Sequence, residues 1–216
     1  MSDYKPNDVI IHRITIVSLD GTKSLVISPT AFTIHESIFD LTISARLKFD
    51  DITDVYGTFP IVGQEVIKIS FEIPGEEEIS EMDFFVNSVS PPVKDAYNKR
   101  TSLMLDLVSI DFLGNNRSNV FRTTALKEGS AIIEELLTSD LETKKKFTAK
   151  VKTTPTQFVI AGWRPLKAVE YMRRKSINVS ESDKSLFLFF DTINDGYTFT
   201  TINQLIEDGI NKYRPE

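Results

Sequence analysis

The chain has 216 residues and contains no cysteine, which excludes disulfide bonds, thiolate zinc sites and thiol catalysis. Hydrophobic residues make up 41% of the chain and charged residues 26%, a balance typical of one large or two small folded domains rather than of disorder. The first residues lack the apolar run of a signal peptide, and no apolar stretch approaches the roughly 18 residues of a membrane-spanning helix.

The net charge of −6 is spread unevenly. Residues 1–110 hold 17 acidic and 9 basic side chains, whereas residues 111–216 hold 14 acidic and 16 basic ones. A surface that grips nucleic acid needs a basic face, so the acidic first half argues against that role. The same acidity is compatible with a lumen through which nucleic acid slides without sticking.

The first predicted elements form a β-hairpin. Residues Ile10 to Ser18 are rich in Ile, Thr and Val. Asp20-Gly21, a dipeptide favoured in tight hairpin turns, then leads into a second strand from Lys23 to Ile27.

Two segments alternate between apolar and polar residues. Between Leu41 and Phe49 the apolar positions are Leu41, Ile43, Ala45, Leu47 and Phe49, and the residues between them are Thr42, Ser44, Arg46 and Lys48. Successive side chains of a strand point to opposite faces, so one face is buried and the other is wet. Val66 to Ile73 shows the same pattern.

Turn signals separate the remaining strands of this half. Pro74-Gly75 ends one strand, Glu76-Glu77-Glu78 forms an exposed tip, and Met82 to Val89 returns as the partner strand. Thr101 to Ile110 is the last strand, with Leu103, Leu105 and Leu107 on one side. We therefore predict a tube-like antiparallel β-barrel or sandwich domain over residues 1–110.

The pattern changes near Asp111, where a smaller mixed α/β domain is predicted over residues 111–216. Its expected elements are a loop at Leu113 to Asn116, a helix from Glu128 to Thr138, a flexible basic loop with Lys144-Lys145-Lys146, a helix from Pro165 to Lys175, a doubly buried strand from Leu186 to Phe190, a turn at Asn194 to Gly196 into Tyr197 to Thr200, and a helix from Thr201 to Asp208. The fold class is therefore mainly β with an α+β part.

Residue types that carry catalysis are scarce. His12 and His35 are the only histidines, and each falls in a strand-like segment, where a structural role is expected. No serine-hydrolase elbow, metalloprotease motif or phosphate-binding loop occurs. Acidic groups such as Glu36 with Asp40 are interpreted as solvated loops, although they leave a glycosidase pair open. No catalytic, cofactor-binding or metal-ligating residue is predicted, and no cofactor.

Two features are candidates for a protein interface. The acidic tip Glu76-Glu77-Glu78 offers charge to a basic partner, and Trp163-Arg164 combines two residue types that interface hot spots favour. A single Trp before a helix also commonly fills the core beneath it, so both interpretations of Trp163 stay open.

Four stretches, taken in order, resemble one protein family. They are Phe32 to Phe39 with the strand that follows to Asp50, Phe59 to Phe71, Gly162 to Leu166 with the helix it opens, and Phe187 to Thr192 with Asp195 to Phe199. In the second stretch, Pro60 to Glu65 is similar to a turn that leads into a strand of a tube-like barrel. Together the stretches resemble the baseplate hub proteins of contractile-tailed phages and the hub half of type VI secretion spike proteins.

The resemblance implies a non-enzymatic structural subunit of the virion tail baseplate, assembled in the host cytoplasm. Family hubs are trimers on the tail axis, with two tube-like β domains in each subunit, so three subunits form a pseudo-sixfold ring. That ring joins the tail tube to the central spike. The implied partners are further copies of the chain, the tail tube protein, the central spike protein, other baseplate proteins, and DNA passing through the channel without specific binding.

This sequence departs from the family pattern in one respect. It shows one tube-like domain, Val9 to Ile110, so six copies rather than a homotrimer would be needed to continue a sixfold tube. A fragment, a shorter hub and half of a split hub all stay open. Two other functions also stay open: a β-sandwich carbohydrate-active enzyme with a carboxylate pair in a concave pocket, and another tube-fold tail protein, such as a distal tail or tube-initiator subunit.

Overall fold

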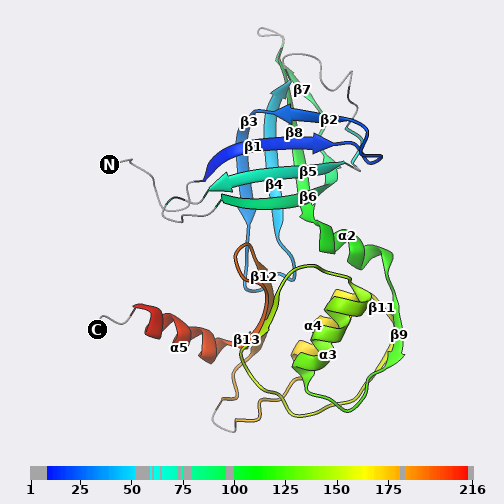
Figure 1. Ribbon diagram of the computed structural model, residues 1–216, viewed down its shortest axis with the longest axis vertical. Coiled ribbons are helices and arrows are strands. Elements are labelled where there is room, and N and C mark those ends of the chain that lie inside the picture. Colours follow the sequence, from blue (N-terminus) through cyan, green and yellow to red (C-terminus); the bar gives the residue numbers. More distant parts are fainter. Residues whose placement is uncertain are drawn as a thin grey trace. The chain divides into compact units, whose positions relative to one another are not determined.

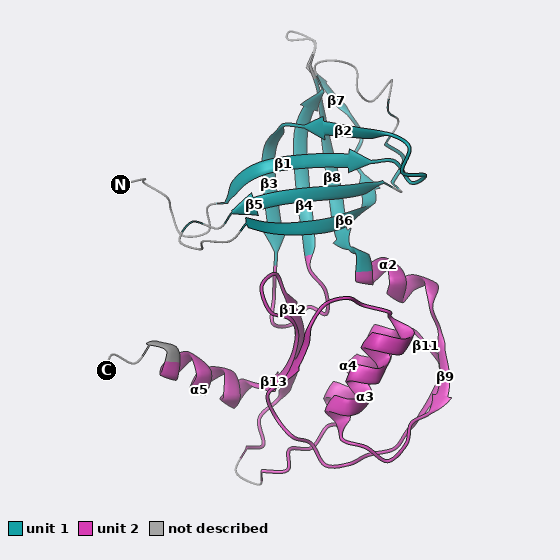
Figure 2. Cartoon of the chain, in the orientation of Figure 1, with its two compact units in different colours: residues 1–35, 44–110 teal, residues 36–43, 111–216 magenta. Residues whose placement is uncertain are grey.

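The computed structural model describes residues 9–51, 59, 61–63, 65–72, 74, 79–95, 100–180 and 183–213. The predicted acidic tip Glu76-Glu77-Glu78 lies outside the described residues, as do Ile73, Pro60 and Gln64. The chain divides into two compact units, residues 1–35 with 44–110 and residues 36–43 with 111–216 (Figure 2). The connection at residues 36–43 thus belongs to the second unit, although both of its neighbours in sequence belong to the first.

The first unit is a curled antiparallel sheet. Its strands are β1 (Ile10–Val17), β2 (Ser24–Ile27), β3 (Pro29–His35), β4 (Ser44–Asp51), β5 (Val66–Glu72), β6 (Ile79–Val89), β7 (Val93–Asp95) and β8 (Arg100–Ser109). Their order is β2-β1-β5-β6-β8-β4-β3, with β7 paired to β8. Only Ser28 separates the two edge strands β2 and β3 in the chain, so the sheet must curl round until one bent segment borders both ends (Figure 1). The predicted tube-like antiparallel fold is confirmed.

The alternation in the sequence sets the core of this barrel. In β4, Leu47 and Phe49 are buried while Arg46 and Lys48 are exposed, and Leu47 lies opposite Leu105 of β8 in the register. Ile67, Ile69 and Phe71 of β5 are also buried. Each such side chain contributes roughly 1.5–3 kcal/mol by leaving water. The predicted buried and wet faces are confirmed.

The second unit mixes helices with short strands. Its elements are α2 (Ile110–Arg117), which begins at the last residue of the first unit, β9 (Val120–Thr123), α3 (Gly129–Glu135), the π-helical turn η1 (Leu136–Asp140), β10 (Phe147–Ala149), β11 (Val159–Trp163), α4 (Pro165–Lys175), β12 (Phe187–Thr192), β13 (Gly196–Thr201) and α5 (Ile202–Tyr213). The strands form a β10-β13-β12 sheet and a separate β11-β9 pair. No helix in the described part of the chain is long and apolar enough to cross a membrane.

Stacked aromatic rings form the core of the second unit. Phe187 stacks on Phe199 at 5.3 Å between ring centroids, and Phe189 stacks on Tyr197 at 5.2 Å. The buried faces of α3 and α4 pack into the same cluster through Ile132, Ile133, Leu166, Val169 and Met172. The predicted helix from Pro165 to Lys175 and the doubly buried aromatic strand are confirmed.

The loop predicted at Leu113 to Asn116 is wrong, because these residues lie in α2. Gly and Asn are weak helix formers, but tertiary contacts override that preference here. Asn115 is buried, and its Oδ1 accepts a hydrogen bond from the backbone N–H of Leu166 at 2.9 Å.

Candidate functional site

The segment around Trp163 is built by a turn between a strand and a helix. Gly162, with a φ of +74°, lies at a bulge within β11, beyond which Trp163 pairs with Val120 of β9. Arg164 has extended backbone and caps α4, and Pro165 occupies the first turn, where its missing N–H costs no helical hydrogen bond. The sequence Gly-Trp-Arg-Pro therefore fixes Trp163 and Arg164 at the start of the helix.

Aromatic side chains gather beside α4. The Trp163 ring meets Tyr171 edge-on, with centroids 5.0 Å apart, and Tyr171 also contacts Phe158 at 5.5 Å. Trp163 and Phe158 are partly buried and pack against the core cluster on their inner sides. Trp163 thus fills the core edge, as one interpretation predicted, while part of it remains at the surface.

Two lysines cover these rings. The Lys167 Nζ lies 5.8 Å from the Trp163 ring centroid, and the Lys175 Nζ lies 5.8 Å from that of Tyr171. A cation over an aromatic face contributes about 0.5–1 kcal/mol at an exposed site. The name α4 face is used for this group of side chains, which are Phe158, Trp163, Arg164, Lys167, Tyr171 and Lys175.

Arg164 links two helices of the second unit. Its Nη1 donates to Asn116 Oδ1 of α2 at 2.6 Å, while much of the side chain stays exposed. The structure therefore places the two predicted interface residues side by side at the start of α4. Their role in an interface stays a prediction, as does that of Glu76-Glu77-Glu78.

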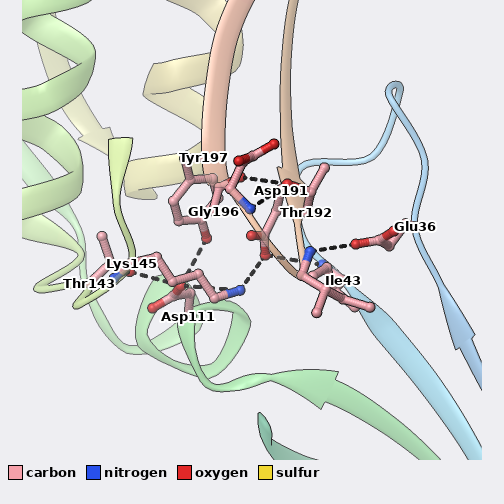
Figure 3. A network of polar contacts seen from close by, with 11 residues as sticks. Glu36, Ile43, Asp111, Thr143, Lys145, Asp191, Thr192, Gly196 and Tyr197 are labelled. Atoms are coloured by element: carbon pink, nitrogen blue, oxygen red, sulfur yellow. Dashed lines mark hydrogen bonds and ion pairs between the residues drawn. The ribbon is translucent and has the colours of Figure 1, made fainter. Parts of the chain in front are cut away.

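A buried polar network lies elsewhere in the second unit (Figure 3). Asp111 Oδ2 accepts hydrogen bonds from the Tyr197 hydroxyl at 3.0 Å and the Thr143 hydroxyl at 2.9 Å. The Lys145 ammonium lies 3.9 Å from Asp111 and donates to Asp191. The flexible basic loop predicted around Lys145 is therefore wrong for this residue, because the two carboxylates hold its side chain partly buried.

The network also holds the connection at residues 36–43. The Ile43 N–H donates to Asp191 Oδ2 at 3.4 Å, and Glu36 accepts a hydrogen bond from the backbone N–H of Ile193. Burial raises the pKa of Asp191 more than Lys145 lowers it, and its Oδ1 lacks a hydrogen-bond partner among the described residues. Burial likewise raises the pKa of Tyr197, and the Asp111 carboxylate adds to the effect.

Asp191 and Asp183, two carboxylates of the second unit, have pKa values shifted in opposite directions. Asp191 has the raised pKa expected of a general acid, but its side chain has no exposed surface and cannot reach a substrate. Asp183 lines a polar hollow of about 620 Å³, and hydrogen bonds from Ser185 and Thr201 lower its pKa to about 2. Within the described ranges, no group of three or more His, Asp or Glu side chains is placed to hold a metal ion.

Charges on the outer face of the barrel occur in cross-strand pairs. Lys68 of β5 bonds to Asp83 of β6 at 3.0 Å. Arg46 of β4 bonds to Asp106 of β8 at 2.9 Å, and the Ser88 hydroxyl donates to the same carboxylate. Each of these two pairs neutralises one cation on the barrel surface.

Solved structures share this fold. The 43 kDa tail protein of prophage MuSo2 from Shewanella oneidensis matches with a TM-score of 0.57 and 11% identity, over 87% of this chain and 53% of that one. A tail protein from Neisseria meningitidis MC58 matches with a TM-score of 0.55 and 9% identity, over 88% of this chain and 51% of that one. A component of the type VI secretion system from E. coli matches with a TM-score of 0.46 and 11% identity, over 89% of this chain and 48% of that one.

The chain spans about half the length of the solved tail proteins it matches. No family model and no curated protein matches it in sequence. The resemblance that the sequence motifs indicated is nevertheless confirmed as a likeness of fold, since barrel and α/β unit together follow the two tail proteins over most of the chain. The chain has the fold of phage tail proteins.

Proposed function

We propose that this chain is a structural subunit of a tail baseplate hub, which joins the tail tube to the central spike around an axial channel. The observation that carries this proposal is the fold match to tail proteins over 87% and 88% of the chain. The α/β segment that follows residue 111 supports the hub over other positions in a tail, such as a distal tail or tube-initiator subunit.

The charge balance of the barrel supports the proposal of a DNA channel. Lysine and arginine grip phosphate by releasing its counterions, so a wall rich in free cations would hold the genome in place. The described residues of the barrel unit hold nine acidic and seven basic side chains, and pairs such as Lys68 with Asp83 neutralise cations between strands. DNA therefore passes such a wall without specific binding.

A hub that surrounds the tail axis must form a ring of subunits. A hub that continues a sixfold tube needs six barrels, and this chain supplies one in its described part. Six copies, or three copies of a longer protein with a second barrel, complete the ring. Its further partners are the tail tube protein, the central spike protein and other baseplate proteins, and it assembles in the host cytoplasm into the virion tail.

The role is structural rather than enzymatic. Its test is the mass of the purified chain in solution, measured by mass photometry over a range of concentrations and salt. We expect closed assemblies of three or six chains and no hydrolysis of peptidoglycan. A chain that stays single at all concentrations, or that cleaves a glycan with a loss of activity on one carboxylate-to-amide change, contradicts the proposal.

A further inference from the structure

The connection between β3 and β4 carries an exposed aromatic side chain. Phe39 has 70% of its surface exposed, and its neighbour Ile38 is exposed as well. Scattered apolar side chains are normal on a protein surface, but Phe39 and Ile38 form one continuous apolar turn. Aromatic side chains are enriched in the cores of protein interfaces. The name apolar tip is used for Ile38 with Phe39.

The apolar tip is held in a fixed position. Within the turn, the Asp40 N–H donates to the carbonyl oxygen of Ser37 at 3.1 Å, and the Phe39 N–H donates to the Ser37 hydroxyl at 3.1 Å. At the base of the connection, hydrogen bonds hold Glu36 and Ile43 to the β12–β13 hairpin (Figure 3). A side chain on an already ordered backbone loses little further entropy when it binds, so Phe39 is suited to anchor a contact.

The barrel unit carries an apolar hollow of about 440 Å³, which is called the barrel hollow. Of the side chains that line it, Phe59 is buried, whereas Leu19 and Val62 are 63% and 72% exposed. Pockets of roughly 300–1,000 Å³ hold whole small molecules, so this volume can receive one aromatic side chain. The exposed rims would be covered by a partner that fills the barrel hollow.

Two turns hold the walls of the barrel hollow in place. Leu19 lies in the turn between β1 and β2, where the Asp20 carboxylate accepts a hydrogen bond from the Ser18 hydroxyl at 2.6 Å. Val62 lies in the turn before β5, and its N–H donates to Glu65 Oε1 at 2.8 Å. The barrel hollow is therefore formed before any partner binds.

The charges beside the tip and the hollow are complementary. Asp40 follows Phe39 and is exposed, and Lys23 lines the barrel hollow and is exposed. Within the described part of the chain, Asp40 and Lys23 have no ion pair. The two carboxylates of the barrel hollow, Asp20 and Glu65, bind donors of their own turns. When Phe39 enters the hollow, Asp40 can therefore pair with Lys23.

A ring of identical subunits closes by joining one surface to a different surface of the next copy. The apolar tip belongs to the second unit and the barrel hollow to the first, so one chain carries both surfaces. We propose that the apolar tip of one copy inserts into the barrel hollow of the next copy, where Asp40 pairs with Lys23. The contact rests on the proposed hub function and goes beyond it by naming the two surfaces that join.

Removal of the aromatic anchor tests the contact. Phe39→Ser in the full chain should weaken self-association about tenfold or more, because the truncation of a central aromatic anchor has a large effect on binding. The matched control is Phe121→Ser on β9, which removes a phenylalanine that is 78% exposed, and it should associate as the wild type does. Sedimentation over a range of concentrations measures association, and circular dichroism checks folding.

Cysteine pairing tests where the tip binds. The chain has no cysteine, so Asp40→Cys and Lys23→Cys can be made separately, mixed and oxidised. A disulfide needs Cα atoms within about 7 Å, so the mixture should form linked pairs about tenfold faster than either variant alone. Asp40→Cys mixed with Lys94→Cys, at an exposed lysine on β7, is the control and should link no faster than the single variants.

The possible failures are distinct. If the wild type does not associate, the ring and the contact both fail. If Phe39→Ser associates as strongly as the wild type, or Phe121→Ser loses as much, the ring stands but the tip does not join its subunits. If Phe39→Ser weakens association while Asp40→Cys links no faster to Lys23→Cys than to Lys94→Cys, the tip binds another surface and the barrel hollow is not its site.

Discussion

At the scale of single residues, Glu65 explains why one stretch of sequence forms a turn. The side chain is buried, and its Oε1 and Oε2 accept hydrogen bonds from the backbone N–H groups of Val62 at 2.8 Å and Gly63 at 3.0 Å. Gly63 has a φ of +93°, which L side chains rarely adopt. The Gly-x-Glu pattern therefore marks a turn that is held by hydrogen bonds from its own backbone to the Glu65 carboxylate and that leads into β5.

The two faces of β4 give a matched pair of substitutions. Leu47→Asp places a charge in the barrel core and should lower the free energy of unfolding by more than about 3 kcal/mol. Lys48→Asp changes the exposed face next to it and should alter that free energy by about 0.5 kcal/mol. Thermal and urea melts of both variants measure the difference. Equal losses would show that the register of β4 is wrong.

Asp183 should determine part of the acid sensitivity of the second unit. Its carboxylate accepts bonds from Ser185, Thr201 and Asn203, which hold its pKa at about 2. Because the folded pKa lies below the unfolded value of about 3.9, this group stabilises the fold above that value and loses its contribution as pH falls towards 2.

Asp183→Asn removes this titration. The variant should be less stable than the wild type at neutral pH, and the gap between the two should narrow between about pH 4 and pH 2. Urea melts across that range provide the measurement. A gap that stays constant with pH would contradict the assigned hydrogen bonds.

At the scale of elements, the turn between β12 and β13 is sensitive to a single methyl group. Gly196 has a φ of +70°, and a Cβ there would lie 2.5 Å from the carbonyl oxygen of Lys146, at the start of the β10–β13 pairing. Gly21 has a φ of +69° but open space around it. The two positions therefore share backbone strain and differ in crowding.

Gly21→Ala should cost about 1 kcal/mol from backbone strain alone. Gly196→Ala should cost clearly more, because β10 or the turn must also move. Urea melts of the two variants separate strain from steric clash. If both cost the same, the close approach of Lys146 to Gly196 is not present in solution.

Elements with strong local patterns could be predicted from the sequence, and those that depend on distant partners could not. The alternation in β4 and β5 and the apolar spacing in α4 depend on nearby residues alone. Helix α2 depends on the bond between Asn115 and Leu166, and the β9–β11 pair joins segments far apart in the chain. No local signal marks such elements.

The candidate site shows the same division. The residue types of Trp163 and Arg164 left a core and an interface interpretation open, and the lysines over the rings were not predicted, because only the folded helix brings them there. Lys145 was misinterpreted for a similar reason, since Asp111 and Asp191 reach it from distant elements.

At the scale of the whole molecule, the acidity of the first half is not a property of the barrel sheet. Residues 1–110 hold 17 acidic and 9 basic side chains. The described residues of the barrel unit hold only nine acidic and seven basic ones. The remaining excess of acidic over basic side chains lies in residues 36–43, which belong to the second unit, and in residues outside the described ranges. On the sheet itself, Lys68 and Arg46 are paired across strands with Asp83 and Asp106.

The central claim is that the chain surrounds the tail axis. Cryo-electron microscopy of tails from the organism that encodes it tests this most directly. We predict a ring of barrels between the tube and the spike, with acidic side chains outnumbering basic ones on the channel wall. A barrel located away from the axis, or a channel wall lined mainly by Lys and Arg, would contradict the account.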